Sequence, residues 1–168
     1  MSLDRMWAGW RSEYIEDVTS KPAGDCVFCD ILASGRPDEE THVVWREPDA
    51  VALLNAYPYT SGHLMVMPIR HAAEPAELTE HESEAVWRGV TQAVAAIRAA
   101  YRPDGINLGA NLGRAAGAGV PGHFHMHALP RWTGDTNFMT SVAEARVLPE
   151  PLDRSAEKLR NGWPLSSS

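Results

Sequence analysis

Three histidines alternate with apolar residues in the run HFHMHAL, from His123 to Leu129. Successive side chains of a strand point to opposite faces, so a strand here would place His123, His125 and His127 on one face. Two residue steps along a strand cover roughly 6.6 Å, about the length over which ring nitrogens can hold a phosphoryl group. The run predicts a strand whose polar face suits phosphate chemistry.

The simpler interpretation of such a row is a metal-binding patch or a polar strand face. Three buried imidazoles on an otherwise apolar strand would carry a heavy desolvation cost without a task. A purification tag is excluded, because tags are uninterrupted and terminal. The alternation therefore favours a functional site.

The length and charge of the chain restrict its class. Its 168 residues suffice for one compact domain with elaborations. A formal net charge of -7 gives no broad basic field for polymeric nucleic acid or an anionic membrane. No run reaches the roughly 18 apolar residues of a membrane helix, and the start lacks the core of a signal peptide. We expect a soluble, cytoplasmic protein with neither polymeric nucleic acid nor membrane as a partner.

Apolar periodicity and turn residues predict an α+β fold with a mostly antiparallel sheet. Thr79 and Glu82 form a capping box at the start of a long helix. The expected elements are a short helix over 26–34, strands over 42–46, 50–54, 63–67, 105–112 and 123–129, the long helix over 80–100, a strand near 141–147 and a short helix near 151–160.

The chain divides into an N-terminal arm over 1–24, a main domain over 25–138 and a C-terminal extension over 139–168. We expect the extension to pack on the domain or on a dimer partner. The arm carries Trp7, Trp10, Arg11 and Tyr14, which would pack onto another surface rather than fold alone. Its aromatic residues suit an exchanged arm between subunits or a place in the core, and both stay open.

The only two cysteines, Cys26 and Cys29, stand together in CVFC. They do not resemble the disulfide framework of a secreted protein. A C-x-x-C pair alone is compatible with a zinc site, a redox site or an accident. No βαβ pattern surrounds the pair, which disfavours a thioredoxin-like redox site.

HFHMHAL matches the His-φ-His-φ-His-φ-φ signature, where φ is apolar, so the chain resembles the histidine triad (HIT) superfamily. LLNAYPYTSGHLMVMP (53–68) is similar to the family's strand with its Gly-His pair, and INLGANLG (106–113) to the strand before the triad loop. The resemblance covers about 26–138. It implies a HIT-like fold, with a mostly antiparallel sheet, a long helix and short flanking helices.

The resemblance also implies site residues. His125 would be the nucleophile that attacks the α-phosphorus, which suits a histidine because its pKa near roughly 6.5 leaves it neutral in the cytoplasm. His127 would contact the phosphate, and His63 would orient His125 through its other ring nitrogen. Asn111 aligns with a side chain at the bridging region or leaving group, and Asn55 with a ribose-side asparagine of some members.

One segment departs from the family pattern. Many members carry Gln followed by Ser or Thr just before the triad, whereas residues 117–122 here read GAGVPG. Backbone N–H groups of Gly117 and Gly119 would replace those donors, since glycine permits close approach to an anion. The alternative is a loop that only connects two strands.

A subset of the family is similar to this chain in having CxFC before the first strand and a histidine after the Gly-His strand, here His71 in MPIRH. The resemblance implies one structural zinc per subunit, held by Cys26, Cys29, His71 and His123. A Cys₂His₂ set is a closed tetrahedral site. His123 would then serve structure, and no organic cofactor is expected.

The segment 6–15, the AYPYTSGH stretch (56–63) and the segment 130–139 look most like the bacterial diadenosine tetraphosphate phosphorylase branch. In that branch a nucleotidyl-histidine is transferred to inorganic phosphate, giving ADP and ATP. Arg131, Trp132, Asp135 and Asn137 would line the second nucleotide or phosphate region, or form a structural extension.

We therefore expect a nucleotidyl hydrolase or transferase that cleaves dinucleoside polyphosphates through a nucleotidyl-histidine. Hydrolysis by water, nucleoside phosphoramidate hydrolysis and a non-catalytic nucleotide-binding module are the alternatives. The intact His125 and His63 argue against the last. Members of the family are usually homodimers, so the resemblance implies a homodimer.

Overall fold

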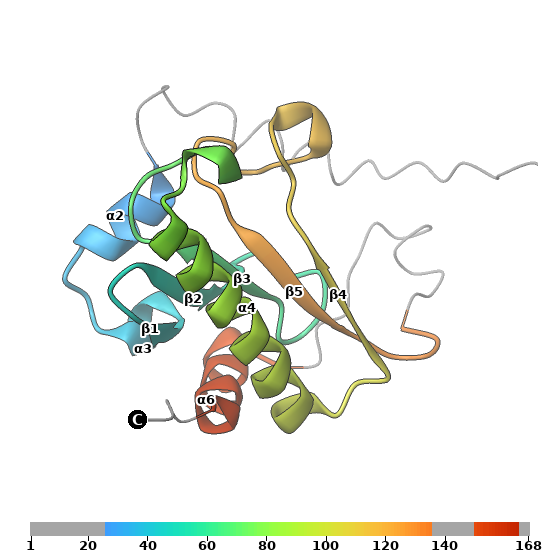
Figure 1. Ribbon diagram of the computed structural model, residues 1–168. Coiled ribbons are helices and arrows are strands. Elements are labelled where there is room, and N and C mark those ends of the chain that lie inside the picture. The colour runs from blue at the N-terminus through green and yellow to red at the C-terminus, as the bar shows by residue number, and fades with distance from the viewer. Residues whose placement is uncertain (1–25, 136–149, 165–168) are drawn as a thin grey trace, which may run out of the picture.

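The computed structural model describes residues 26–135 and 150–164 (Figure 1). In these ranges one five-stranded sheet has the order β1-β2-β3-β5-β4, and every neighbouring pair is antiparallel. The strands are β1 (Val43–Arg46), β2 (Ala50–Leu54), β3 (Leu64–Pro68), β4 (Gly105–Gly109) and β5 (Met126–Arg131). The α+β architecture with an antiparallel sheet is confirmed.

The helices surround this sheet, and one of them was not predicted. They are α2 (Val27–Ala33), α3 (Asp38–Thr41), α4 (Glu80–Tyr101) and α6 (Leu152–Gly162), with 3₁₀ turns η1 (Pro75–Glu77) and η2 (Arg114–Ala116). The single turn of α3 has the sequence DEET, which carries no apolar periodicity. It is tied to β1 by an ion pair of 2.8 Å between Arg46 and Asp38.

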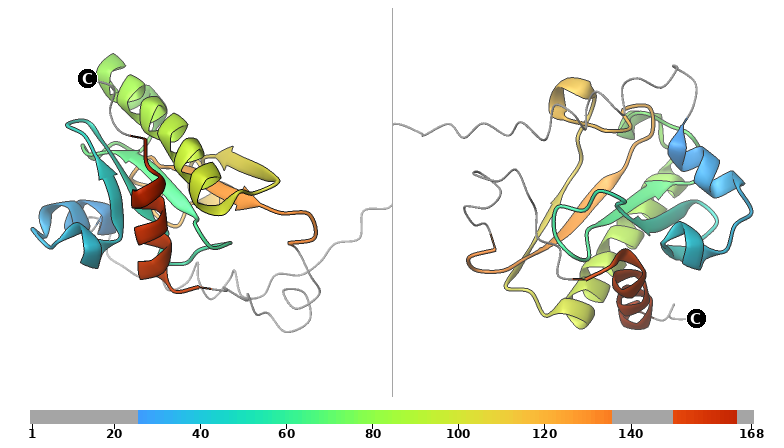
Figure 2. Two further views of the ribbon diagram at one scale, coloured as in Figure 1. Left: turned by 90° about the horizontal axis from the view of Figure 1, so that it is seen from below. Right: turned by 180° about the vertical axis from the view of Figure 1, so that it is seen from behind.

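Strands β2 and β3 are buried on both faces, and each face has its own apolar core. Figure 2 shows α4 and α6 lying side by side over one face of the sheet. The core on that side includes Ala52, Leu54 and Val66. The other core joins Val51 and Met65 to residues of α2 and its start. Continuous apolar runs such as AVALL are typical of strands covered on both sides.

Helix α4 begins at the predicted capping box. The Thr79 hydroxyl accepts a bond from the Glu82 N–H at 3.2 Å, and the Glu82 carboxylate accepts one from the Thr79 N–H at 2.8 Å. Two bonds of 2.7 Å from Arg70 to the same carboxylate join the helix start to the end of β3. The hydrogen bonds from Arg70 hold the pKa of Glu82 down at about 2.

Helix α6 covers α4 and the start of β1. Ala156 and Leu159 are fully buried. The Arg160 guanidinium donates to the Val43 carbonyl at 2.6 Å. Trp163, just after the helix, stacks on Trp45 with ring centroids 5.4 Å apart. The expected helix near 151–160 thus forms and holds the outer strand of the sheet.

Strand β5 begins three residues later than predicted, at Met126 instead of position 123. Its partner β3 pairs Val66 with Met126, and two residues further along the same register would bring Pro68 opposite Phe124. Proline has no N–H to give to a ladder. Phe124 donates to the Ala72 carbonyl at 2.6 Å instead. Strand β4 likewise ends at Gly109, although the prediction ran to position 112.

The predicted alternation of faces nevertheless extends through the whole run. Phe124 and Ala128 are buried in the core beneath α4, and Met126 packs against them. The three histidines that alternate with these residues occupy the other side and are all buried. The alternation of residue types therefore predicted which face each side chain occupies correctly, although the predicted start of the strand was wrong.

Several expectations lie outside the described residues. They concern the N-terminal arm over 1–24, the strand near 141–147 and Asn137. Among the helices of the described ranges, none combines the length and apolar character needed to cross a membrane.

A substitution at Gly89 tests how closely α4 packs against the sheet. A Cβ at this position would lie 2.7 Å from the Trp45 ring and 2.9 Å from Val66. Gly89→Ala should lower the free energy of unfolding by about 1–3 kcal/mol through overpacking, although alanine is favoured over glycine in helices by about 1 kcal/mol. Urea unfolding measures the change. Gly105→Ala is the control, because a Cβ there would meet nothing within 4 Å. A stabilised Gly89→Ala protein would contradict this close packing.

Candidate functional site

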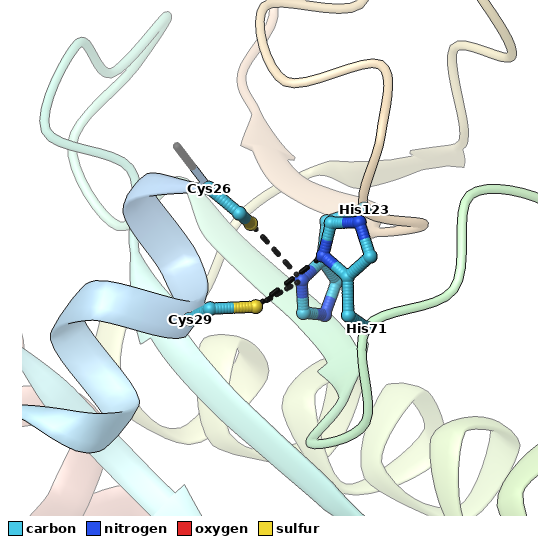
Figure 3. Close-up of side chains that lie close together, drawn as sticks. All are labelled: Cys26, Cys29, His71 and His123. Atoms are coloured by element: carbon cyan, nitrogen blue, oxygen red, sulfur yellow. Dashed lines mark hydrogen bonds between the residues drawn. The ribbon is translucent and has the colours of Figure 1, made fainter. Parts of the chain in front are cut away.

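Four side chains of types that bind metals meet beside α2 from three segments of the chain. Cys26 and Cys29 come from the start of α2, His71 follows β3, and His123 precedes β5. Figure 3 shows both thiols pointing at the two imidazoles. One donor atom from each residue lies within 4.8 Å of all the others. The structure therefore brings together the complete set expected for a metal.

Three sulfur–nitrogen distances within this cluster fit a tetrahedral zinc ion. Zn–S bonds of about 2.3 Å and Zn–N bonds of about 2.0 Å at tetrahedral angles separate sulfur from nitrogen by about 3.5 Å. Nδ1 of His123 lies 3.3 Å from the Cys26 sulfur and 3.6 Å from the Cys29 sulfur. Nδ1 of His71 lies 3.3 Å from the Cys29 sulfur.

The surroundings of His123 also suit a metal ligand. Its Nε2 lies 2.9 Å from the Pro68 carbonyl, which can only accept a hydrogen bond. The proton of the neutral ring is therefore on Nε2, and the lone pair of Nδ1 faces the two thiols. Metal-bound histidines commonly donate their other N–H in this way.

Burial and the hydrogen bond with Cys26 raise the pKa of the Cys29 thiol to about 11. Without a cation this thiol stays protonated at neutral pH. A divalent cation would reverse the preference, because it stabilises the thiolate directly.

The middle histidine of the run is held by the backbone of the first. Nδ1 of His125 lies 2.7 Å from the His123 carbonyl. A carbonyl only accepts, so the proton of the neutral His125 ring is on Nδ1 and the lone pair is on Nε2. Burial lowers the pKa of His125 and favours this neutral form. Among the described residues, Nε2 has no hydrogen-bond partner.

His63 and His127 form a second hydrogen-bonded pair, in which each ring carries its proton on Nε2 rather than on Nδ1 as in His125. The Tyr59 N–H donates to Nδ1 of His63 at 3.1 Å, so the proton of neutral His63 is on Nε2. That Nε2 lies 2.9 Å from Nδ1 of His127. His127 therefore accepts at Nδ1 and carries its own proton on Nε2. Burial, aided by His125, lowers the pKa of His127 to about 4, so the ring is neutral at pH 7.

This arrangement corrects the expected partner of His63. The prediction placed His63 against the second ring nitrogen of His125, but its Nε2 faces His127 and the His123 carbonyl occupies Nδ1 of His125. The neighbouring rings of His125 and His127 have centroids 4.9 Å apart. One offers a lone pair and the other a proton, a combination that suits attack on phosphorus and donation to a phosphoryl oxygen.

Of the two predicted asparagines, one contacts a site histidine and the other contacts the glycine loop. Asn55 is buried, its carbonyl accepts from the Tyr57 N–H at 2.9 Å, and its amide nitrogen lies 3.5 Å from Nδ1 of His63. Asn111 donates to the Gly117 carbonyl at 3.5 Å. Asn55 thus supports the turn that carries His63, and nucleotide contact by either asparagine stays a prediction.

The glycine loop uses one of its two expected N–H donors internally. The Gly117 N–H donates to the Arg114 carbonyl at 2.9 Å and closes η2. Gly117 has φ +90°, a conformation that favours glycine. The expectation that its N–H serves an anion is therefore wrong. Among the described residues, the Gly119 N–H has no backbone partner, so it stays a candidate donor.

The last residue of β5 and the turn after it brace the sheet. Arg131 forms two bonds with the Asp135 carboxylate, at 2.6 and 2.7 Å, and one with the Asn107 side chain at 2.9 Å. Trp132 also donates its N–H to Asp135 at 3.0 Å. For Arg131 and Asp135 these contacts favour the structural interpretation over a nucleotide-binding one.

Two aromatic residues beside the histidines were missed from the sequence. Phe28 lies edge-on to His125, and the Tyr59 ring lies 4.7 Å from that of His63. Phe28 stands between the two cysteines and Tyr59 stands four residues before His63, so their closeness in sequence to site residues was the available signal.

Comparisons with known proteins agree on one family. A family model described as the HIT domain matches residues 36–134, more than half of the chain. The chain is 36% identical over 167 residues to a Mycobacterium tuberculosis (strain ATCC 25618 / H37Rv) protein named AP-4-A phosphorylase, covering 96% of this chain and 85% of that protein.

Two solved structures share the fold. A Zn-bound histidine triad family protein from Mycobacterium smegmatis aligns with a TM-score of 0.67 and 24% identity, over 82% of this chain and 92% of that one. A HIT family member from Bacillus subtilis aligns with a TM-score of 0.60 and 28% identity, over 86% and 99%.

The histidine tautomers can be measured directly. Nitrogen NMR of ¹⁵N-histidine-labelled protein at pH 7 should show His125 protonated on Nδ1, with His63 and His127 protonated on Nε2, because backbone groups determine the direction of each chain of hydrogen bonds. The exposed His81 is the internal control and should show the mixed tautomers of a solvated ring. Protonation of neutral His125 on Nε2 would contradict the assigned geometry.

Proposed function

This chain belongs to the HIT domain family, and on that premise we propose that it cleaves dinucleoside polyphosphates through a nucleotidyl-histidine on His125. The predicted family, its fold and the classification as one of the family's enzymes are confirmed by the comparisons. The observation that carries the proposed mechanism is the bond between Nδ1 of His125 and the His123 carbonyl, which leaves a lone pair on Nε2.

In the first step, Nε2 of His125 attacks the α-phosphorus. An N–P bond forms, and the bond from phosphorus to the bridging oxygen breaks with its electron pair leaving on the polyphosphate product. The His125 ring becomes positively charged, and the His123 carbonyl stabilises that charge through the Nδ1–H. The Nε2–H of His127 donates to a phosphoryl oxygen or to the leaving oxygen. His63 keeps this proton in place by donating to Nδ1 of His127.

In the second step, an acceptor oxygen attacks the same phosphorus and the N–P bond breaks, which returns its electron pair to Nε2. Diadenosine tetraphosphate would release ATP in the first step. Transfer to inorganic phosphate would then give ADP, and transfer to water would give AMP. Splitting one displacement into two steps lowers the barrier of each.

Phosphate as the acceptor and diadenosine tetraphosphate as the substrate are supported by the mycobacterial relative. That relative is named AP-4-A phosphorylase, and the match covers nearly all of this chain. Candidate donors for the phosphoryl oxygens are the Gly119 N–H and the side chain of Asn111. Asn55 would contribute on the ribose side.

We further propose that Cys26, Cys29, His71 and His123 hold one structural zinc ion per subunit. The donor set and its spacing support this, as argued above. Zinc bound there would have four protein ligands and no open position, so it would supply stability rather than chemistry. It would fasten the start of α2 to the segment before β5.

We also propose that the protein is a homodimer. Within the described ranges β4 is an edge strand of the sheet, and the apolar Leu108 on it and Leu112 just after it are exposed. Apolar side chains on an unpaired edge favour association with another chain. A symmetric pair of such edges is a common way to form a dimer.

Product analysis tests the proposed reaction. Diadenosine tetraphosphate should give ADP and ATP only when inorganic phosphate is present, as measured by anion-exchange chromatography. AMP and ATP in phosphate-free buffer would instead indicate hydrolysis. No cleavage under either condition, with a phosphoramidate substrate turned over, would overturn the substrate assignment.

His125→Ala and His125→Gly should both abolish turnover in this assay, because they remove the nucleophile, while the substrate still binds. His81→Ala is the matched control, since His81 is an exposed histidine on α4. Full activity in either His125 variant would refute the nucleophile assignment.

The metal proposal predicts about one zinc per chain by elemental analysis of the purified protein. Cys26→Ser and His71→Asn should lose it. Structural zinc contributes on the order of 10 kcal/mol in zinc-finger peptides. Even about 3 kcal/mol lowers Tm by about 6–12 °C in a domain of this size. His81→Asn is the control for His71→Asn. Absence of stoichiometric metal, together with an unchanged Tm in Cys26→Ser, would contradict the proposal.

A further inference from the structure

Phe28 contacts both the proposed nucleophile and a member of the proposed zinc-ligand set. That set, called the metal cluster below, consists of Cys26, Cys29, His71 and His123. Phe28 lies in α2 between Cys26 and Cys29 and is 5% exposed. Its ring meets the imidazole of His123 with centroids 5.6 Å apart and that of His125 with centroids 5.2 Å apart, edge-on in both cases. None of the catalytic roles described above uses this side chain.

The backbone hydrogen bond alone does not determine the orientation of His125. The bond from Nδ1 to the His123 carbonyl directs one ring atom, but the ring can still tilt about that bond. Phe28 and His127 both lie against the ring, with centroids at 5.2 and 4.9 Å, and so restrict its tilt. Attack on phosphorus requires the Nε2 lone pair to lie in line with the bond that breaks.

The position of Phe28 depends in turn on the metal-binding residues. Helix α2 has seven residues and no side-chain cap. Isolated helices of this length are not stable in water. Apart from Phe28 and Cys26, which are buried in the core that includes Met65, its other apolar residues are partly exposed. The burial of Phe28 and Cys26, together with the contacts of both cysteines with His71 and His123, therefore holds the helix start against the sheet.

We infer that Phe28 is a positioning residue for His125, and that through it the metal cluster sets the orientation of the nucleophile. A metal ion bound to Cys26 and Cys29 fixes the backbone that carries the Phe28 ring. The same ion bound to His123 fixes the residue whose carbonyl holds Nδ1 of His125. The contact from Phe28 and the hydrogen bond from the His123 carbonyl therefore both depend on residues of the same metal cluster. This inference rests on the proposed function, because it assigns a purpose to the orientation of His125.

The test compares Phe28→Leu with Leu32→Ala in the zinc-loaded protein. Both remove apolar contacts of α2 with the same core, but only Phe28 places an aromatic ring against the His125 imidazole. Phe28→Leu should lower kcat and the rate of nucleotidyl-histidine formation about 10- to 100-fold, because small misplacements of a reacting atom have effects of this size. KM and zinc content should stay unchanged. Leu32→Ala should keep kcat within about twofold of the wild-type value.

A spectroscopic readout distinguishes positioning from general destabilisation. In the zinc-loaded wild type, His125 should give one sharp Nδ1–H signal in ¹⁵N NMR. Phe28→Leu should broaden or shift it while the signals of His63 and His127 stay in place, and removing zinc from the wild type should produce the same change. Leu32→Ala should leave the signal unaltered.

An unchanged kcat and an unchanged His125 signal in Phe28→Leu would overturn the inference, as would equal losses in Phe28→Leu and Leu32→Ala. These outcomes are separate from failure of the proposed function. If the wild type forms no nucleotidyl-histidine, the proposed function fails, while the NMR comparison still decides whether Phe28 and the metal orient His125.

Discussion

The hydrogen bond between Nδ1 of His125 and the His123 carbonyl is the interaction on which the rest of the site depends. It determines which nitrogen of His125 carries the lone pair, and it ties that ring to the backbone of a metal-cluster residue. His123 is itself held at both ring nitrogens, by the Pro68 carbonyl and by the thiols. One residue therefore joins the end of β3, the start of α2 and the proposed nucleophile.

The sheet separates this polar site from the main core. The apolar residues between the histidines are buried beneath α4, so the run cannot slide along β3 without moving histidines into that core. On the opposite side, the pairing of Met65 with His127 brings the histidine just before β3 close to the end of the run. His63 and His127 can then form their 2.9 Å contact. Packing on one face thus determines the hydrogen bonds on the other.

Where the predictions were wrong, either a backbone hydrogen bond that residue types do not reveal or a missing donor was responsible. Strand β5 starts late because Pro68 offers no N–H to the register that would include Phe124. Gly117 does not keep its N–H free, because a 3₁₀ turn uses it. His63 meets His127 because backbone groups on neighbouring segments already occupy the other nitrogens. Residue types and spacing do not reveal which of several acceptors a ring nitrogen will reach.

The sequence by itself determined the order of the strands and the long helix, the capping box of α4 and the alternation of faces in HFHMHAL, and the family resemblance implied the four Cys and His residues that meet beside α2. These depend on local periodicity, on neighbouring residue types or on a motif with a set spacing. Only the tertiary structure decided the histidine tautomers, the partner of His63 and the contact of Phe28 with His125. The partner of His63 and the contact of Phe28 join segments distant in the chain, such as His63 and His127, which lie 64 positions apart. The tautomers depend on which backbone group each ring nitrogen reaches, and residue types alone do not reveal that.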